Sequence, residues 1–427
     1  MARRTNPHEQ RRSERMKKVV FISHGHPDLS KGGAEVASWN LYELLKQNGY
    51  ECLYIARTGG KSHGGSTFSK HNDEVLFHTS MSDWFNLSSS HLKPLFNDLA
   101  DLLAQFDPDI VHIHHYAHMG IELFPAVKRA VPDAKVLLTL HEFMAMCMNN
   151  GQMVKRETLK LCNKAAVSDC HKCFPSHSPG DFLLRKSYVL DQLSYVDEFI
   201  SPSVFLAQRY TDWGLAKDKM HVIENVLPDL QPIVPRELGE GEKRAKFAFF
   251  GQVNPYKGID ILLQALLFLP EHIKSQVTLE IHGANLDAQT SEFKEKVEKL
   301  LESTGSMVDF RGPYESEQLR SRIADCDWVI IPSIWWENSP VVIQEAIHFG
   351  RPLIGSNIGG MKEKIEGKAG LTFEARSANS LAQMMVKAIE PEVFDFWHER
   401  LNRNQQAQNE HLAMLKDLFS DYSATGL

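Results

Sequence analysis

Short apolar segments of strand length alternate along the chain with longer segments in which apolar residues recur at helical spacing. This alternation is typical of a parallel β-sheet that is covered by helices on both faces. The chain shows the pattern twice. In its first half the predicted strands cover residues 17–25, 51–57, 108–116, 134–143, 196–203 and 220–228. In its second half they cover residues 247–251, 277–283, 307–314, 327–333 and 351–357.

The two halves are separated by a charged segment rich in proline and glycine, residues 227–246. A chain of 427 residues is also long enough for two cores, which tend to separate beyond roughly 250–300 residues. We therefore predict two doubly wound, Rossmann-like α/β domains whose ligand sites lie at the carboxyl ends of the strands. The predicted parts are a disordered basic tail at 1–16, domains at 17–228 and 229–395, and a helix at 396–427 that returns toward the first domain.

The net charge of −7 argues against a surface built for nucleic acid. The charge is uneven, because residues 1–18 hold seven Lys or Arg and two Glu. This basic tail is either a solvated arm or a peripheral contact with anionic lipid. We see neither the apolar core of a signal peptide nor an apolar run of membrane-spanning length. The expected location is cytoplasmic, with the inner face of the membrane as the place where the tail could make contact.

Two glutamates, Glu337 and Glu345, stand eight positions apart around a predicted helix start. Ser339 provides a capping hydroxyl, Pro340 is favoured at the first helical position, and Gly350 suits the helix end. This arrangement predicts Glu337 on the loop after a strand and Glu345 on the second helical turn. Because carboxylates accept hydrogen bonds from hydroxyls, the pair suits a ligand that carries several hydroxyl groups.

Features that suit a phosphate lie near the same motif. Gly359 and Gly360 follow a predicted strand and precede a helix, so their backbone can approach an anion closely. Lys257 lies on the loop after the first strand of the second half, where its ammonium can meet a phosphate. In the first half, Gly32 and Gly33 precede a helix and predict a similar amide-rich anion site.

The segments GQVNPYKGIDILLQAL, EIHGA, FRGPY, ENSPVVIQEAIHFGRPLIGSNIGG and KGGAE together resemble the retaining nucleotide-sugar glycosyltransferases of the GT-B fold. The resemblance implies that Glu345 accepts the ribose hydroxyls of the donor and that Glu337 contacts the transferred sugar. It implies that Glu35, with Gly32, shapes the acceptor side. It also implies a donor site that includes Gly33, Gln252, Lys257, Gly283, Tyr314, Asn338, Ser339, Gly359 and Gly360. Gln252 departs from the arginine common in this family and carries no charge for a diphosphate.

Several histidines follow the strands of the first half. Strand alternation places His112 and His114 on one face and His115 on the other, so spacing alone does not bring them together. We therefore expect no catalytic metal. The resemblance implies that His141 lies against the transferred sugar; the alternative is a histidine that only ends a strand. No residue has the pattern of a general base, which agrees with the family's chemistry, in which the leaving phosphate takes the acceptor's proton.

Four of the six cysteines occur within a polar segment, residues 142–180, that we interpret as an insertion. They are Cys147, Cys162, Cys170 and Cys173, and the last two form a CxxC pair. Four thiolates in a reducing compartment suit a structural zinc ion. Disulfides, or reduced thiols that bind no metal, are the alternatives.

These observations predict a retaining glycosyltransferase that moves a hexose from a UDP- or GDP-type sugar to a glycan or lipid-linked acceptor in surface polysaccharide synthesis. A nucleotide-sugar 2-epimerase of the same fold is one alternative. A non-catalytic protein that binds nucleotides or glycans is another.

Overall fold

The computed structural model describes residues 17–30, 32–59, 65–89, 93–227, 231–404, 413 and 416–417, and all structural statements concern these residues. The chain divides into two compact units, with the boundary after Pro228. Of the described residues beyond Asn404, Lys416 contacts the first unit, where its ammonium donates to the Asn48 side chain at 3.0 Å. The predicted tail at 1–16 and most of the predicted helix beyond Asn404 lie outside the described residues.

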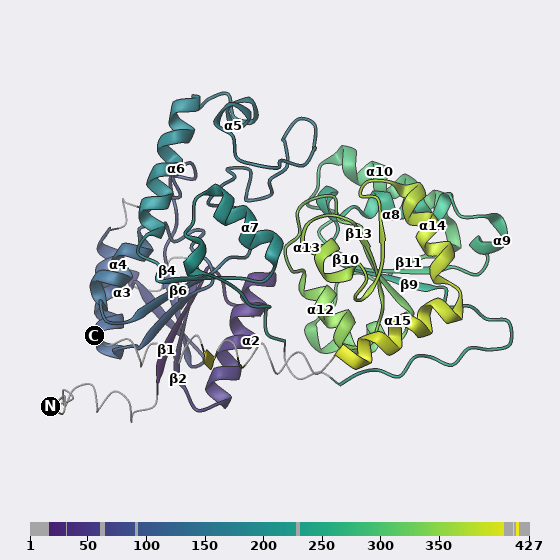
Figure 1. The fold of residues 1–427 in the computed structure, drawn as a ribbon, viewed down its shortest axis with the longest axis horizontal. Coiled ribbons are helices and arrows are strands. Elements are labelled where there is room, and N and C mark those ends of the chain that lie inside the picture. The colour runs from purple at the N-terminus through teal and green to yellow at the C-terminus, as the bar shows by residue number, and fades with distance from the viewer. Residues whose placement is uncertain are drawn as a thin grey trace. The chain divides into compact units, whose positions relative to one another are not determined.

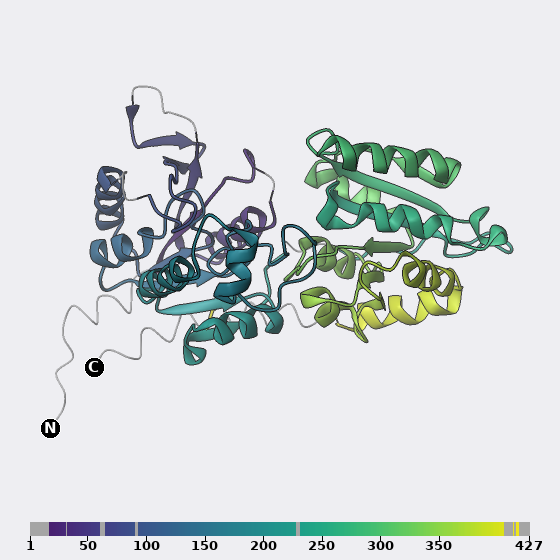
Figure 2. The same ribbon diagram turned by 90° about the horizontal axis from the view of Figure 1, so that it is seen from above.

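The first unit contains an eight-stranded sheet in the order β3-β4-β2-β1-β5-β6-β7-β8. Neighbouring strands are parallel except β3 and β4, which form an antiparallel hairpin at one edge (Figure 2). The strands are β1 Lys18–Ser23, β2 Glu51–Thr58, β3 Phe68–His71, β4 Glu74–His78, β5 Ile110–Ile113, β6 Lys135–Thr139, β7 Glu198–Ser201 and β8 Met220–Val222.

Helices cover this sheet, as Figure 1 shows. They are α2 Gly33–Gln47, α3 Lys93–Phe106, α4 Leu123–Ala130, α6 Pro179–Leu193 and α7 Val204–Trp213. The short helix α5 Val167–Cys173 packs against α6 instead. Helix α2 follows β1 directly and packs Leu41 and Leu45 against Phe21 of β1 and Tyr54 of β2. Gly49 ends α2 in the left-handed conformation, as its position in the sequence predicted.

The second unit contains a six-stranded parallel sheet in the order β11-β10-β9-β12-β13-β14. Its strands are β9 Lys246–Gln252, β10 Thr278–Ala284, β11 Val308–Phe310, β12 Trp328–Ile331, β13 Leu353–Ser356 and β14 Gly370–Phe373. Its helices are α8 Ile259–Leu267, α9 Glu271–Lys274, α10 Ser291–Thr304, α11 Leu319–Ala324, α12 Val341–His348, α13 Gly359–Ile365, α14 Ala378–Ala388 and α15 Pro391–Asn404.

Side-chain alternation along the strands gives this second sheet two cores. Trp328 and Ile330 of β12 face one way and belong to the core that α8, α10 and α14 complete. Val329 and Ile331 face the other way and belong to the core that includes residues of α11, α12 and α13. Because both faces of the strand are buried, β12 is apolar at every position.

The predicted architecture of two Rossmann-like α/β domains is confirmed, but three strands were missed. The hairpin β3–β4 is short and turns through Asn72 in the left-handed conformation, and β14 has only four residues. None of the three has the long apolar run that marked the other strands. No helix within the described ranges combines the length and the apolar character needed to cross a membrane.

Candidate active site

The strand order of the second sheet reverses between β9 and β12, with β10 and β11 on one side and β13 and β14 on the other. In open parallel sheets, ligands bind at the carboxyl ends of the strands at such a reversal. The loops that follow β9 and β12, residues 253–258 and 332–340, therefore flank the expected site.

The loop after β9 is shaped to present Lys257. The Asn254 side chain accepts hydrogen bonds from the backbone amides of Tyr256 and Lys257, both at 3.0 Å. Gly258 then adopts a φ of 69°, and a Cβ there would lie 2.1 Å from the carbonyl oxygen of Pro332. Since that contact is with backbone, the position requires glycine. The two loops are held together as the Ile334 amide donates to the Tyr256 carbonyl at 2.9 Å.

Glu337 lies on the loop after β12, as predicted, and its side chain is the centre of a hydrogen-bond network. One oxygen, Oε1, accepts from the Lys257 ammonium at 2.6 Å, from the Ser333 hydroxyl at 2.9 Å and from the Trp335 indole at 2.9 Å. Glu337 is 6% exposed, so this ion pair is stronger than one in open water. The pair joins the two loops at the strand-order reversal and fixes where the Lys257 charge lies.

The predicted helix cap at Ser339 is wrong. Helix α12 begins at Val341, and Pro340, with a ψ of 127°, takes the capping position itself. Ser339 lies one position before the capping residue of α12. Its hydroxyl instead accepts a hydrogen bond from the side-chain amide of Gln344 at 3.0 Å. The neighbouring Asn338 is buried beside it. The left-handed stop at Gly350 is confirmed, with a φ of 72°.

Glu345 lies on α12 and is only partly exposed. Burial raises the pKa of its carboxyl to about 7, and no hydrogen bond or ion pair of this side chain is recorded within the described ranges. Burial, and secondly the Glu345 charge, also raises the pKa of the Tyr314 hydroxyl, so these two side chains share one environment. A carboxyl that changes charge near neutral pH is a candidate for binding a ligand.

Gly359 and Gly360 do not precede the helix, as predicted, but are the first two residues of α13, where Gly360 packs against the loop that carries Glu337. A Cβ on Gly360 would lie 1.6 Å from the Asn338 carbonyl oxygen, and the Gly360 amide donates to the Glu337 carbonyl at 2.8 Å. The preceding Gly359 has a φ of 56°. The segment that follows β13 is thus hydrogen-bonded to the loop that carries Glu337. The Gly360 amide is used in this bond within the protein.

Two further residues that the resemblance assigns to the donor site lie near these loops, Gly283 on β10 and Tyr314 on the loop after β11. Gly283 of β10 lets the strands approach, because a Cβ there would lie 2.5 Å from the Gly251 carbonyl oxygen. The Tyr314 ring packs edge-on against Phe250, with centroids 5.6 Å apart. Gln252 is exposed at the end of β9. Tyr314 follows β11 and so lies on the β10 side of the strand-order reversal. At position 283, the close approach of β9 requires a glycine.

Sequence reasoning missed three contributors to this site. Ser333 and Trp335 orient Glu337, and neither has a recognisable pattern outside the folded loop. Arg376 follows β14 and donates to the Ile334 carbonyl at 3.3 Å, which places its guanidinium beside the glutamate loop. It is a second positive charge near Lys257 in a chain that has Gln252 in place of the family's arginine.

In the first unit, strand order reverses between β1 and β5, and Glu35 lies at the start of α2. Glu35 is 3% exposed and accepts from the Ser30 hydroxyl at 2.9 Å. A Cβ on Gly32 would lie 2.4 Å from a Glu35 oxygen, whereas Gly33 is exposed. A carboxylate thus sits at the amide end of the helix where we expected an anion site.

The histidines of the first unit lie close together, contrary to the expectation from spacing. The His114 and His141 imidazoles are hydrogen-bonded at 3.2 Å, and the His24 and His115 rings lie 4.2 Å apart. They meet because β1, β5 and β6 are neighbours in the sheet. Burial lowers the pKa of His24 and of His112 to about 3 and that of His115 to about 4, and takes that of His141 well below its usual range. These rings are neutral at neutral pH.

Glu142, directly after His141, was missed by the sequence analysis. Burial raises the pKa of its carboxyl to about 8, and one oxygen lies 3.4 Å from the His115 imidazole. A protonated carboxyl beside neutral imidazoles offers hydrogen-bond donors without charge. The only signal in the sequence was its place after a strand.

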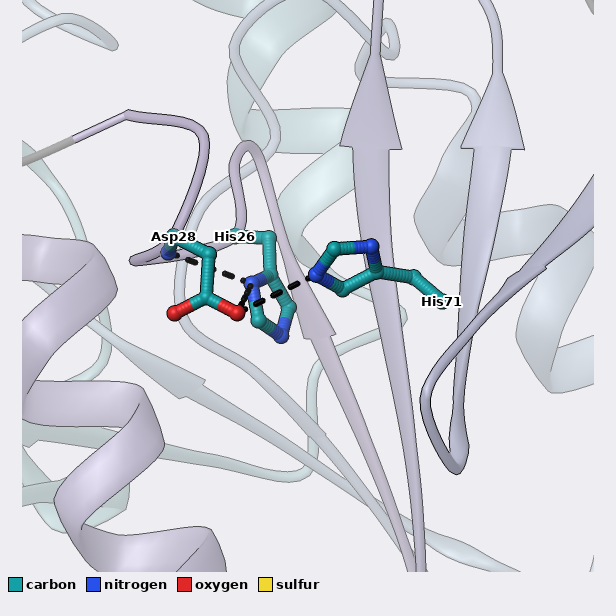
Figure 3. Close-up of side chains that lie close together, drawn as sticks. All are labelled: His26, Asp28 and His71. Carbon is teal, nitrogen blue, oxygen red and sulfur yellow. Dashed lines mark hydrogen bonds and ion pairs between the residues drawn. The ribbon is translucent and has the colours of Figure 1, made fainter.

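One group of three potential metal ligands lies in the described part of the chain, formed by His26, Asp28 and His71. One Asp28 oxygen faces both rings, 3.1 Å from His71 Nε2 and 3.6 Å from His26 Nδ1 (Figure 3). The Asp28 backbone amide, however, donates to the same His26 Nδ1 at 3.2 Å. Because the Nδ1 lone pair of His26 already accepts this hydrogen bond, the group fits a hydrogen-bonded cluster better than a metal centre.

Two family models match the chain one after the other. The model described as Glycosyltransferase Family 4 matches residues 31–228, and the model described as Glycosyl transferases group 1 matches residues 231–410. Together they span both units. Each unit thus matches a glycosyltransferase family model, which supports the coarser part of the prediction, a glycosyltransferase of the GT-B fold.

Individual relatives agree with this assignment. The chain is 21% identical to a lipopolysaccharide 1,2-N-acetylglucosaminetransferase of Salmonella typhimurium over 393 residues, which cover 88% of this chain and 90% of the relative. A D-inositol 3-phosphate glycosyltransferase of a Nocardioides species is 27% identical over 168 residues, 37% of this chain and 36% of the relative.

Solved structures share the fold. Sucrose-phosphate synthase from Thermosynechococcus elongatus has a TM-score of 0.66 at 16% identity, with 95% of this chain and 100% of that chain covered. Anabaena HepE in complex with UDP and glucose has a TM-score of 0.64 at 17% identity, with 96% and 100% covered.

Proposed function

We propose that this chain is a retaining glycosyltransferase that moves a hexose from a nucleoside-diphosphate sugar to a glycan or glycolipid acceptor. The observation that supports this most is the network around Glu337. It joins a carboxylate to the Lys257 ammonium at 2.6 Å, at the strand-order reversal of the second sheet. Glu345, whose carboxyl has a pKa raised to about 7, follows on the adjoining helix.

In this proposal the donor lies along the three strand-end loops of the second unit. Lys257 contacts the diphosphate, and Arg376, which donates to the Ile334 carbonyl of the same loop that carries Glu337, is a second candidate positive charge. Glu345 accepts hydrogen bonds from the ribose hydroxyls, and Tyr314 lies beside the base. The Anabaena structure contains UDP and glucose, which supports a uridine nucleotide as the first donor to test.

The chemistry requires stabilisation of charge on the leaving diphosphate, because the bond from the sugar's anomeric carbon to the phosphate oxygen breaks as the acceptor oxygen bonds to that carbon. Lys257 can supply this stabilisation, and Glu337 holds its ammonium in place. The acceptor attacks the face from which the diphosphate leaves, and its proton passes to the leaving phosphate oxygen. His141, which is neutral, can donate a hydrogen bond to the transferred sugar.

One relative supports a class of acceptor for this proposal. The Salmonella relative, which matches 88% of this chain, is a lipopolysaccharide glycosyltransferase. We infer that this chain also acts on a saccharide of a surface glycan or its lipid-linked precursor.

The test is incubation with a panel of nucleotide sugars and saccharide acceptors, with nucleotide release and acceptor mass followed together. The product's anomeric configuration, determined by NMR, should match that of the donor. Glu337→Gln and Glu345→Gln should lose turnover, whereas Glu295→Gln on the exposed side of α10 should keep it. An inverted product contradicts the retaining mechanism. Interconversion of the donor sugar without an acceptor indicates an epimerase instead, and nucleotide binding without turnover indicates a regulator.

A further inference from the structure

We propose that Cys147, Cys162, Cys170 and Cys173 bind one structural zinc ion in the first unit. All four side chains line a single pocket, together with apolar neighbours that include Met148, Val154 and Phe174. The proposal is independent of the glycosyltransferase reaction, because it concerns a different group of side chains from those that meet the donor.

Three backbone segments bring the thiols to the pocket. Cys147 lies on the turn that follows β6. The chain then reverses through a hairpin in which the Cys162 amide donates to the Met153 carbonyl at 2.8 Å, which returns Cys162 to the first turn. Helix α5 carries Cys170 and Cys173 three positions apart and therefore on one face. The irregular spacing in the sequence thus becomes a convergent set in the fold.

Backbone amides support a negative charge on the Cys147 sulfur, because the amides of Asn149 and Met153 donate to it. At Cys162 a backbone hydrogen bond from Lys164 also lowers the pKa, although the thiol itself donates to the Lys164 carbonyl at 3.2 Å. Hydrogen bonds from outside the ligand set commonly orient metal ligands and stabilise their charged form. A buried thiol that only packed against apolar groups would have no use for them.

The charges around the pocket fit a metal that carries thiolates. Zinc with four thiolates has a net charge of −2. The Arg185 guanidinium, which is 3% exposed, acts electrostatically on Cys147 and Cys170. Lys155 lies near Cys162, where it is also 3.5 Å from Asp169.

In the described part of the chain, no three of these cysteine sulfurs all lie within 4.8 Å of one another. They are therefore further apart than in a zinc complex. Zinc–sulfur bonds of about 2.3 Å hold tetrahedral sulfurs about 3.8 Å apart. Binding therefore includes a small inward movement of the turn, the hairpin and α5.

The ion would anchor the loop that carries His141 and Glu142. Arg185 of α6 already holds this loop by donating to the Ala145 carbonyl at 2.6 Å and to the Met144 carbonyl at 3.0 Å. Cys147 follows directly. A zinc ion would tie the loop's far end to α5 and thereby fix the segment that follows β6.

The direct test is the metal content of the full chain, purified from zinc-containing medium without chelator. We expect about one zinc per chain, and about none in Cys162→Ser or Cys170→Ser. Cys52→Ser, on β2, and His71→Ala, in the His26–Asp28–His71 cluster, should keep the metal. Cobalt in place of zinc should give the charge-transfer absorption of tetrahedral thiolate ligation, which requires no variant.

Four results contradict the proposal. The first is a wild-type protein that folds without bound metal, and the second is a disulfide between any two of these cysteines. The third is bound iron with inorganic sulfide in place of zinc. The fourth is a zinc ion that the Cys162→Ser variant keeps and the His71→Ala variant loses.

Discussion

The two units share a doubly wound plan but place opposite chemistry where their strand orders reverse. In the second unit, Glu337 and Lys257 form an ion pair at 2.6 Å, and Glu345 can ionise near neutral pH. In the first unit, the side chains at this edge include His24, His115 and His141, all with a lowered pKa and therefore neutral. The second unit's edge offers charge to a phosphate, whereas the histidines at the first unit's edge offer uncharged hydrogen bonds.

This difference agrees with the division of labour that we propose. A leaving diphosphate is stabilised by a fixed positive charge. The transferred sugar instead needs hydrogen-bond partners that do not themselves form a bond to its anomeric carbon. The experiments below change the charge on one edge at a time and ask whether the two edges respond differently.

The largest effect is expected for Glu337→Gln. This change keeps the shape of the side chain but removes the charge that holds Lys257, so kcat should fall about 100- to 1,000-fold. Steady-state kinetics of the folded variant would measure the loss, with Glu295→Gln as the control. A fall in kcat of less than tenfold would contradict the claim that the charge at the second unit's edge is essential for the reaction.

Acid should weaken the first unit selectively. A lowered histidine pKa contributes stability that is complete above the unfolded pKa of about 6.5 and is lost as the pH falls below it. With folded pKa values of about 3 for His24 and about 4 for His115, each should cost about 2 kcal/mol of unfolding free energy at pH 5. Glu345 acts in the opposite direction, because a raised pKa favours the fold at low pH and loses that contribution as the pH rises toward 7.

Hydrogen exchange followed by mass spectrometry can compare the units, with rates corrected for intrinsic pH dependence. Peptides from β5 and β6 should lose protection between pH 7.5 and pH 5 to a greater extent than peptides from β9 and β12. His24→Asn should reduce the loss. Equal responses of the two sheets would contradict the lowered pKa values of His24 and His115.

Nucleotide affinity should rise with pH around neutrality. Ribose hydroxyls donate to a carboxylate, so binding should favour the charged form of Glu345 and weaken about tenfold from pH 8 to pH 6. Calorimetric titration with UDP over this range would measure the slope. Glu345→Gln should bind weakly with little pH dependence, and a slope that survives in this variant must come from another group.

The smallest effect is expected for Gln252→Arg. The side chain at the end of β9 is exposed, so an added charge should improve the apparent donor KM by at most about fivefold, in line with about 1 kcal/mol for exposed ion pairs. Gln252→Lys is a useful partner variant. A KM that stays constant or rises would show that charge on this strand end does not limit donor binding.

The second unit's site could be predicted largely from sequence because its features are local. The end of β12, the start of α12 and the stop at Gly350 lie within one short stretch, which placed Glu337 on a loop and Glu345 on a helix. The error at Ser339 was also local, since Pro340 occupies the capping position. The donors to Glu337 from Ser333 and Trp335 depend on how the loop folds back, which no spacing rule predicts.

The first unit's site depends on strand order instead. His24, His115 and His141 come from the ends of three strands that are distant in sequence and adjacent only in the sheet. Spacing gave the correct face for individual residues but could not give the neighbours. The cysteines likewise could not be brought together from their spacing in the sequence. They converge because the chain between Cys147 and Cys162 folds into a hairpin.

The measurement that tests the central claim most directly is the hydrogen-exchange footprint of a bound nucleotide. Thermal shifts with UDP, GDP, ADP and dTDP would first select the nucleotide that stabilises the chain most. Its binding should then protect peptides that contain residues 253–258 and 333–345 of the second unit, and Glu345→Gln should lose this protection. Protection confined to the first unit, or protection of the second unit that is unchanged in Glu345→Gln, would contradict the proposed donor site.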